Sequence, residues 1–280
     1  MNNLSLSWIK KNHLKLINKI LPEKINNNSI LIEIKSASIC GSDLKILKNG
    51  SSRVKKGRTI GHELSGIIYK KGSNIRKFKK GDSVSLGADY PCMKCYYCKN
   101  NQANNCISNS AIGHEINGGF ANYLMLNKSF LENGPIKKFD KNKIDFDEAC
   151  LAEPLACCLN GFSKVGDVQK KNVLIFGAGS IGNLLCMLAI YFKAKNIFLV
   201  DIDSKKLNMS KKIHGNKIQT LNANYNYFKK VMKKTNGLGC QIIFTACSNF
   251  EAIKNSFKLL SKNSFLNIFG GLAKNQIKKL

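Results

Sequence analysis

The sequence predicts an α/β protein of two domains, in which a β-rich first half is followed by a doubly wound parallel sheet. Three observations support this fold class. The 280 residues suffice for two domains with a core each, and 44% of them are hydrophobic, as in globular proteins. Short apolar segments dominate the first half, whereas apolar runs and helical stretches alternate from about Glu153 onward. We therefore expect domains at 1–153 and 154–280.

The first half is predicted to consist of short strands. Residues 29–35 (SILIEIK) largely alternate between apolar and polar side chains, which is typical of a strand with one buried face. Further strands are predicted over 64–69, before a turn at Gly72, and over 83–86, after a Gly-Asp turn. These segments give residues 1–153 their β-rich character.

The second half is predicted to be a series of βαβ units. Helical stretches such as 181–192 and 250–260 separate short apolar runs, and this alternation indicates a parallel sheet. The five predicted strands are 173–176, 197–200, 217–221, 242–245 and 265–269.

A glycine-rich turn follows the first of these five strands. It reads GAGSIG, which is the GxGxxG pattern, and a helix is predicted directly after it. The first glycine permits a tight turn, the second lets a pyrophosphate approach the backbone, and the third allows close helix packing. The phosphates would face the helix N-terminus, and an ordinary glycine-rich turn is the alternative interpretation. The predicted cofactor-binding residues in this segment are Gly177, Gly179, Ser180, Ile181 and Gly182.

Asp201 closes the next strand, at the position where a carboxylate would bind the ribose 2′-hydroxyl. The same carboxylate would repel a 2′-phosphate, so the sequence predicts NAD in preference to NADP. Lys205 and Lys206 lie nearby in the sequence and keep NADP as the less favoured alternative.

Four cysteines follow a C-x2-C-x2-C-x7-C pattern within a lobe near residues 88–110. Four thiolates at this density suit a closed, tetrahedral structural zinc with no open position for chemistry. A redox C-x-x-C motif fits poorly, because this segment is a polar loop and not a helix start beside a sheet. An iron–sulfur cluster was the other alternative. The predicted structural-zinc ligands are Cys92, Cys95, Cys98 and Cys106.

Taken together, the motifs resemble those of the zinc-containing medium-chain alcohol dehydrogenases, within them the sorbitol/polyol and threonine dehydrogenase branch. Besides the cysteine lobe and the glycine-rich turn, the resemblance rests on CGSD at 40–43, GHE at 61–63 and Glu153-Pro154, in the family order. It covers essentially the whole chain. It implies a GroES-like β-rich catalytic domain and a Rossmann domain, with the active site in the cleft between them.

The resemblance implies a catalytic zinc beside the structural one, so two zinc ions in all. Removing a hydride from an alcohol carbon requires the hydroxyl proton to leave, and a Lewis-acidic zinc lowers the pKa of that hydroxyl. Such a zinc takes three protein ligands and leaves a fourth position open. Cys40 and His62 are the first two candidates. The third stays open between Glu63, next to His62, and Glu153, which stands where the simple alcohol dehydrogenases carry a cysteine.

The residues after Cys40 supply the groups expected to handle protons. Asp43 matches the family carboxylate that orients the liganding histidine, and Ser42 matches the hydroxyl that takes the substrate proton. The relay histidine expected five residues after the cysteine is Lys45 here, which departs from the family pattern. Lys45 is hypothesised to meet an anionic substrate group such as a phosphate.

A second GHE tripeptide occupies residues 113–115, after the cysteine lobe. It has no cysteine at the matching distance upstream. His114 is therefore interpreted as a surface-loop residue.

The formal net charge of +28 suggests an anionic partner at first sight. Only three of the 45 basic residues are arginines, however, and the lysines are scattered, as in an AT-rich coding sequence. No specific nucleic-acid partner is expected. A basic zinc-ribbon nucleic-acid binder would leave Cys40, His62 and the glycine-rich turn unexplained.

No targeting or membrane segment is predicted. The longest apolar run, 184–192, is far shorter than the ~20 residues needed to span a bilayer, and residues 1–21 lack the apolar core of a signal peptide. With eleven cysteines and no export signal, thiols and metal ligation are favoured over disulfides. A cytoplasmic location is expected.

The leading functional hypothesis is a zinc-dependent oxidoreductase that transfers a hydride from a secondary alcohol, a polyol or amino-alcohol, to NAD. The alternative is a truncated, catalytically inactive remnant that binds zinc and nucleotide. A sixth Rossmann strand and the closing segment of the catalytic domain are expected to be absent, which would leave 265–269 as an edge strand. Relatives pair subunits through that sixth strand, so homo-oligomerisation is in doubt.

Overall fold

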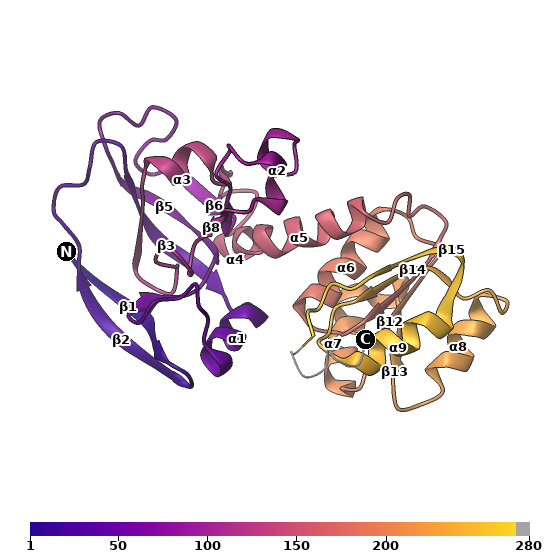
Figure 1. Cartoon of the computed structure of the whole chain (residues 1–280). Coiled ribbons are helices and arrows are strands. Elements are labelled where there is room, and N and C mark those ends of the chain that lie inside the picture. The colour runs from indigo at the N-terminus through magenta and orange to yellow at the C-terminus, as the bar shows by residue number, and fades with distance from the viewer. Residues whose placement is uncertain (273–280) are drawn as a thin grey trace. The chain divides into compact units, whose positions relative to one another are not determined.

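The computed structural model describes residues 1–272, which form two compact units. The first unit runs from Met1 to Glu153, and the second begins at Pro154 (Figure 1). The first is rich in strands and the second is built on a parallel sheet. The α/β fold class predicted from the sequence is confirmed.

The first unit holds most of its strands in two antiparallel sheets. A five-stranded sheet has the order β10-β6-β5-β3-β9, a three-stranded sheet the order β2-β1-β4, and β7 pairs with β8. The strands are β1 (Asn2–Lys10), β2 (His13–Ile20), β3 (Ile30–Ser38), β4 (Arg58–Thr59), β5 (Glu63–Lys71), β6 (Ser83–Leu86), β7 (Asp89–Tyr90), β8 (Ser110–Ala111), β9 (Tyr123–Leu126) and β10 (Ile136–Lys138).

Short helices complete this unit. Its core is formed by apolar side chains from strands, such as Ile32 on β3 and Leu64 on β5, together with Phe78 from a loop and Phe130 from a helix. The helices are α1 (Gly41–Asn49), α2 (Tyr96–Lys99), α3 (Lys128–Asn133) and α4 (Phe146–Cys150), and α5 (Ala152–Ser163) begins at the unit's end.

The second unit is a five-stranded parallel sheet with the order β13-β12-β11-β14-β15. All five strands predicted in this half are present. They are β11 (Asn172–Phe176), β12 (Asn196–Asp201), β13 (Gln219–Asn222), β14 (Cys240–Thr245) and β15 (Leu260–Asn267), and the helices between them are α6 (Ser180–Tyr191), α7 (Ser204–His214), α8 (Tyr227–Lys234) and α9 (Phe250–Leu259).

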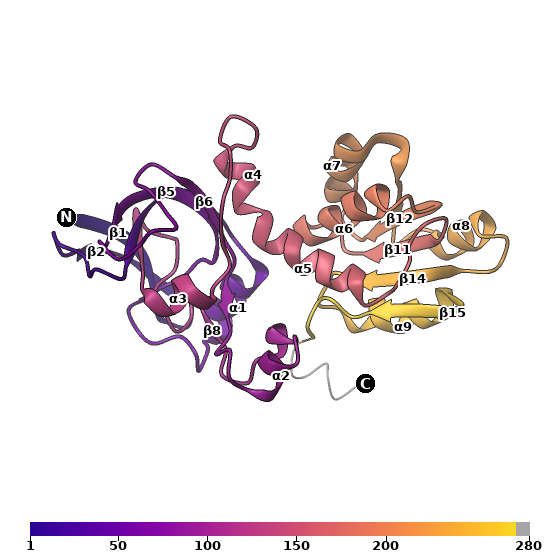
Figure 2. The ribbon, with the colours of Figure 1, turned by 90° about the horizontal axis from the view of Figure 1, so that it is seen from above.

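Helices cover both faces of this sheet (Figure 2). On the central strand β11, Val173 and Ile175 pack toward α5, α6 and α7, while Leu174 and Phe176 pack toward α8 and α9. A strand buried on both faces must be apolar throughout, which is why this segment shows no alternation in the sequence.

No helix among the described residues has both the length and the apolar character that crossing a membrane requires.

Candidate functional site

Cys40, His62 and Glu63 gather in the first unit. A sulfur, a ring nitrogen and a carboxylate oxygen from these residues lie within 4.8 Å of one another. The antiparallel register of β3 and β5 explains the meeting, because Ser38 near the end of β3 is paired with Glu63 at the start of β5. Cys40 follows Ser38 by two residues and therefore lies beside His62.

The imidazole of His62 is held on two sides. Its Nδ1 lies 3.6 Å from Oδ1 of Asp43, and its Nε2 lies 3.4 Å from the hydroxyl oxygen of Ser42. The carboxylate of Asp43 is itself buried and accepts the backbone N–H groups of Cys40 (3.0 Å) and Gly61 (3.3 Å). Asp43 thus fixes the ring, the start of α1 and the backbone before the ring at once.

This environment favours positive charge at the ring of His62. Burial by itself lowers the pKa of His62, but hydrogen bonds with Asp43 and Cys40 outweigh it and raise the pKa to about 11. A divalent cation bound at the ring would satisfy the same preference. Thiolate, imidazole and carboxylate are ligands that zinc accepts, so the donor set of Cys40, His62 and Glu63 fits this metal.

The two carboxylates considered as third ligand differ in position. Glu63 is buried, and its carboxylate accepts a short hydrogen bond from the hydroxyl of Ser38. Glu153 is half-buried at the start of α5 and is not part of the group formed by Cys40, His62 and Glu63. Lys45 lies exposed on α1.

His114 lies in a loop, as expected, but it is not simply a surface residue. Its side chain is half-buried, and its ring packs edge-on against that of His62 with 6.1 Å between centroids. Its Nδ1 is buried and has no hydrogen-bond partner among the described residues. Burial and the positive charge of Arg53 lower the pKa of His114. The repeated GHE tripeptide was the sequence signal that could have identified His114. The two tripeptides pack closely, because a Cβ on Gly113 would lie only 3.1 Å from the carbonyl oxygen of Gly61.

A salt bridge fixes the loop that carries His114. Arg53 donates to both carboxylate oxygens of Glu115 at 2.7 and 2.9 Å, and Glu115 also accepts the backbone N–H of Ala111 at 2.9 Å. A bidentate pair of this kind restrains the loop more than a single contact would.

The four cysteines of the lobe also come together, with all four sulfurs within 4.8 Å of one another. The sulfurs of Cys95 and Cys98 are 3.5 Å apart, and Cys106 accepts the backbone N–H of Cys92 at 3.2 Å. Backbone hydrogen bonds from Cys98 and Ile107 lower the pKa of Cys95 to about 6. Four sulfurs gathered this closely form a closed donor set that fits a structural zinc.

The glycine-rich turn lies between β11 and α6 in the second unit. Gly177 has a φ of 104°, and a Cβ there would come within 2.9 Å of the carbonyl oxygen of Ala246. A Cβ on Gly182 would collide with the carbonyl oxygen of Gly177. Gly179, by contrast, has nothing within 4 Å of its Cβ position. The fold itself requires the first and third glycines, whereas the second leaves open space at the start of α6 where Ser180 is exposed.

Asp201 lies at the rim of a pocket of about 430 Å³ beside this turn. Its two carboxylate oxygens accept the backbone N–H groups of Ala178 (2.7 Å) and Asp203 (2.8 Å). Lys206 and Tyr227 line the same pocket. The open space and the oriented carboxylate fit the nucleoside end of a dinucleotide.

Two further residues support the turn and were not identified from the sequence. The side-chain amide of Asn183 donates to the carbonyl oxygens of Ala178 (3.2 Å) and Gly179 (2.9 Å). Its Oδ1 lies 3.0 Å from Nε2 of His214, which is buried on α7. Asn183 and His214 therefore hold the carbonyl side of the turn while Asp201 holds an amide on the other side.

Comparisons with known proteins find alcohol and polyol dehydrogenases. Residues 26–135 match the alcohol dehydrogenase GroES-like domain. D-xylulose reductase A of Aspergillus oryzae is 27% identical over 98% of this chain and 77% of its own length. Galactitol 1-phosphate 5-dehydrogenase of Escherichia coli K12 is 30% identical over 75% of this chain, and the match spans 58% of that protein. A solved dehydrogenase from Sinorhizobium meliloti 1021, bound to NADP, has the same fold, with a TM-score of 0.87 at 23% identity over 98% of this chain and 78% of its own.

Proposed function

We propose that this chain is a zinc-containing medium-chain alcohol dehydrogenase that transfers a hydride from a secondary alcohol of the polyol class to NAD. Its match to the alcohol dehydrogenase GroES-like domain supports this, as does its similarity to D-xylulose reductase A and galactitol 1-phosphate 5-dehydrogenase. The observation that carries the proposal is the cluster of Cys40, His62 and Glu63, with Asp43 behind the ring.

Cys40, His62 and Glu63 are the residues that would hold the catalytic zinc. A zinc ion in this position supplies Lewis acidity, which lowers the pKa of an alcohol hydroxyl. Asp43 keeps Nδ1 of His62 occupied, so Nε2, which faces Ser42, is the nitrogen that would bind the metal. Ser42 would accept the substrate proton at its hydroxyl oxygen and pass it toward solvent.

The cysteine lobe would hold the second, structural zinc. Its four sulfurs leave no position for a substrate, so its role is to stabilise the loop that they close. A reducing, cytoplasmic setting is proposed with it, because thiolates that ligate zinc must stay reduced.

NAD is the proposed hydride acceptor. The turn from Gly177 to Gly182 would hold the pyrophosphate, with the backbone of Ser180 and Ile181 at the start of α6 facing it. Asp201 favours NAD because its carboxylate would repel a 2′-phosphate. NADP is the second candidate, since Lys206 lines the same pocket and a solved relative of the same fold is bound to NADP.

Lys45 is proposed to distinguish phosphorylated from free polyols. A relative is a galactitol 1-phosphate dehydrogenase, and Lys45 on the exposed side of α1 is the residue proposed to meet a phosphate. If so, Lys45→Met will lower kcat/KM for a phosphorylated polyol and leave the value for the free polyol unchanged. Equal values for both substrates in wild type and variant would remove Lys45 from this role.

Native mass spectrometry of the purified chain and of Cys40→Ser is the primary test. We expect two zinc ions in the wild type and one in the variant. In a turnover assay with polyols and NAD, the wild type should form NADH and the variant should not. One zinc in both proteins would contradict the catalytic site. Two zinc ions without turnover on a panel of free and phosphorylated polyols would favour the second candidate, a zinc- and nucleotide-binding protein without activity.

A further inference from the structure

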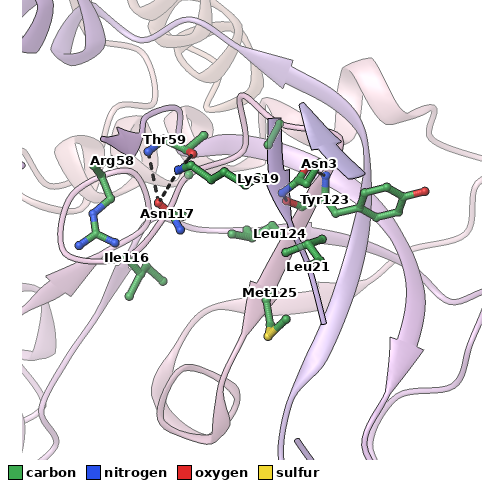
Figure 3. Close-up of a pocket in the computed structure, with 12 residues that line it drawn as sticks. Asn3, Lys19, Leu21, Arg58, Thr59, Ile116, Asn117, Tyr123, Leu124 and Met125 are labelled. Carbon is green, nitrogen blue, oxygen red and sulfur yellow. Dashed lines mark hydrogen bonds between the residues drawn. The ribbon is translucent and has the colours of Figure 1, made fainter. Parts of the chain in front are cut away.

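A pocket of about 250 Å³ lies in the first unit, separate from both cysteine sites. Side chains from β1, β2, β4 and β9 line it, together with the loop that contains Asn117 (Figure 3). Leu21 and Leu124 give it apolar walls, whereas Lys19 and Arg58 bring two positive charges to it. Its volume is below the range typical of whole drug-sized ligands, so it suits a small group.

No carboxylate offsets these two charges. Nζ of Lys19 donates to the carbonyl oxygen of Gly57 (2.9 Å), to Oγ1 of Thr59 (2.8 Å) and to Oδ1 of Asn117 (3.4 Å), all of which are neutral. Within residues 1–272, neither Lys19 nor Arg58 forms an ion pair, and the residues that line the pocket include no Asp or Glu.

The two cations also disfavour each other. Burial lowers the pKa of Lys19, and the positive charge of Arg58 lowers it further. Nε of Arg58 is buried and has no hydrogen-bond partner among the described residues. A buried donor without a partner and two unpaired like charges are both unfavourable, and one bound anion would relieve both after a small shift of the guanidinium.

The composition of the chain adds a second argument. Arginine is rare here, with three instances among 45 basic residues. Arg53 uses its planar guanidinium to form the bidentate pair with Glu115. Arg58 lines the pocket but has no such partner within the described residues, and Figure 3 shows its guanidinium beside Ile116. A planar fork of donors is the group that recognises oxyanions best.

We propose that this pocket binds a small tetrahedral oxyanion of the phosphate class between Lys19 and Arg58. The site is distinct from the zinc and dinucleotide sites and does not depend on the proposed function. Free phosphate and a phosphomonoester share the chemistry, and the apolar walls formed by Leu21 and Leu124 favour the second.

Isothermal titration calorimetry with inorganic phosphate and with glycerol 3-phosphate tests this site, at constant ionic strength set by KCl. The background is Cys40→Ser, so that phosphate does not bind at an open catalytic zinc. We expect saturable binding whose affinity depends on both Lys19 and Arg58, whatever phosphate binds at the glycine-rich turn or beside Lys45. The dissociation constant should rise by at least about tenfold in Arg58→Gln and in Lys19→Gln, because each removes a charge-assisted hydrogen bond.

Arg76→Gln is the matched control, since Arg76 is exposed, lies outside the pocket and loses the same charge. It should leave the dissociation constant unchanged, and Arg58→Lys should weaken binding less than Arg58→Gln. Zinc content and far-UV circular dichroism verify that each variant is folded. Tighter binding of glycerol 3-phosphate than of phosphate would assign a phosphomonoester, and equal binding would assign free phosphate. Absence of saturable binding, or equal weakening in Arg58→Gln and Arg76→Gln, would overturn the proposal.

Discussion

The two clusters of metal-ligating side chains are built in opposite ways. Cys40, His62 and Glu63 come from the end of one strand region and the start of another, and a buried sheet with Asp43 and Ser38 positions them. The four lobe cysteines come from one short segment, 92–106, whose surroundings are turns and exposed side chains. The first cluster is organised by the fold, whereas the second needs its metal to organise the chain around it.

The largest effect is expected from removing a lobe ligand. Cys98→Ser should lose one zinc and leave residues 92–106 unprotected, because structural zinc typically contributes ~10–16 kcal/mol of apparent binding energy to such a loop. Hydrogen exchange followed by mass spectrometry should show fast exchange in this segment alone. Cys40→Ser is the control, and it should lose the other zinc with no change in exchange of the lobe. Equal changes in the hydrogen exchange of residues 92–106 in both variants would contradict the distinction between the two clusters.

The second effect concerns Asp43, which orients His62 in the cluster of Cys40, His62 and Glu63. Asp43→Asn should weaken zinc binding at Cys40 and His62 by about 10- to 100-fold, since residues that orient a liganding histidine contribute on this scale. Competition with a chromophoric chelator measures the affinity. The lobe should retain its zinc under the same conditions. A variant with wild-type affinity would mean that the sheet alone positions the ring.

The third effect is a pH dependence of the zinc-free protein. The pKa of His62 is raised from 6.5 to about 11, so its stabilising contribution is fully present below pH 6.5 and is lost as pH rises toward 11. The melting temperature of zinc-free protein should therefore fall across this window. In the zinc-loaded protein the metal replaces the proton, and the fall should be smaller. Asp43→Asn should flatten the profile of the zinc-free form, and an unchanged profile would contradict the role of the carboxylate.

The smallest effect tests whether the glycine-rich turn is also organised by the fold. His214→Leu removes the hydrogen bond that holds Asn183 and should raise the dissociation constant of NADH by about three- to tenfold. Fluorescence titration with NADH measures it, with Asn183→Ala expected to act in the same direction. The zinc content should stay as in the wild type. Unchanged NADH affinity in both variants would show that Asp201 alone fixes the turn.

Much of the second unit could be predicted from the sequence because its signals are local. Each strand of a covered parallel sheet is a continuous apolar run, and the glycines of the turn are required by φ at Gly177 and by contact at Gly182. In the first unit, the strands that became β3, β5 and β6 were also predicted. The zinc ligand candidates followed from motif order, whereas the meeting of Glu63 with Cys40 and His62 depends on the register of β3 against β5, which motif order does not show.

The features that escaped prediction depend on tertiary contacts or weak local signals. His114 reaches His62 from 52 residues away, and His214 reaches Asn183 from 31 residues away, distances over which periodicity carries no information. The hairpin of β1 and β2 turns at Asn12, which has a φ of 56°, but it lacks the Asn-Gly pair that marks such turns.

The packing of one GHE tripeptide against the other places a second imidazole, that of His114, beside the ring of His62. A His62→Ala protein still contains His114, whose ring lies about 6 Å from the place of the lost one and whose Nδ1 has no partner within residues 1–272. Metal retained by that single variant is therefore no argument against His62 as a ligand. The double variant His62→Ala/His114→Ala is therefore the proper reference for zinc at the Cys40 site, with the zinc of the cysteine lobe still bound.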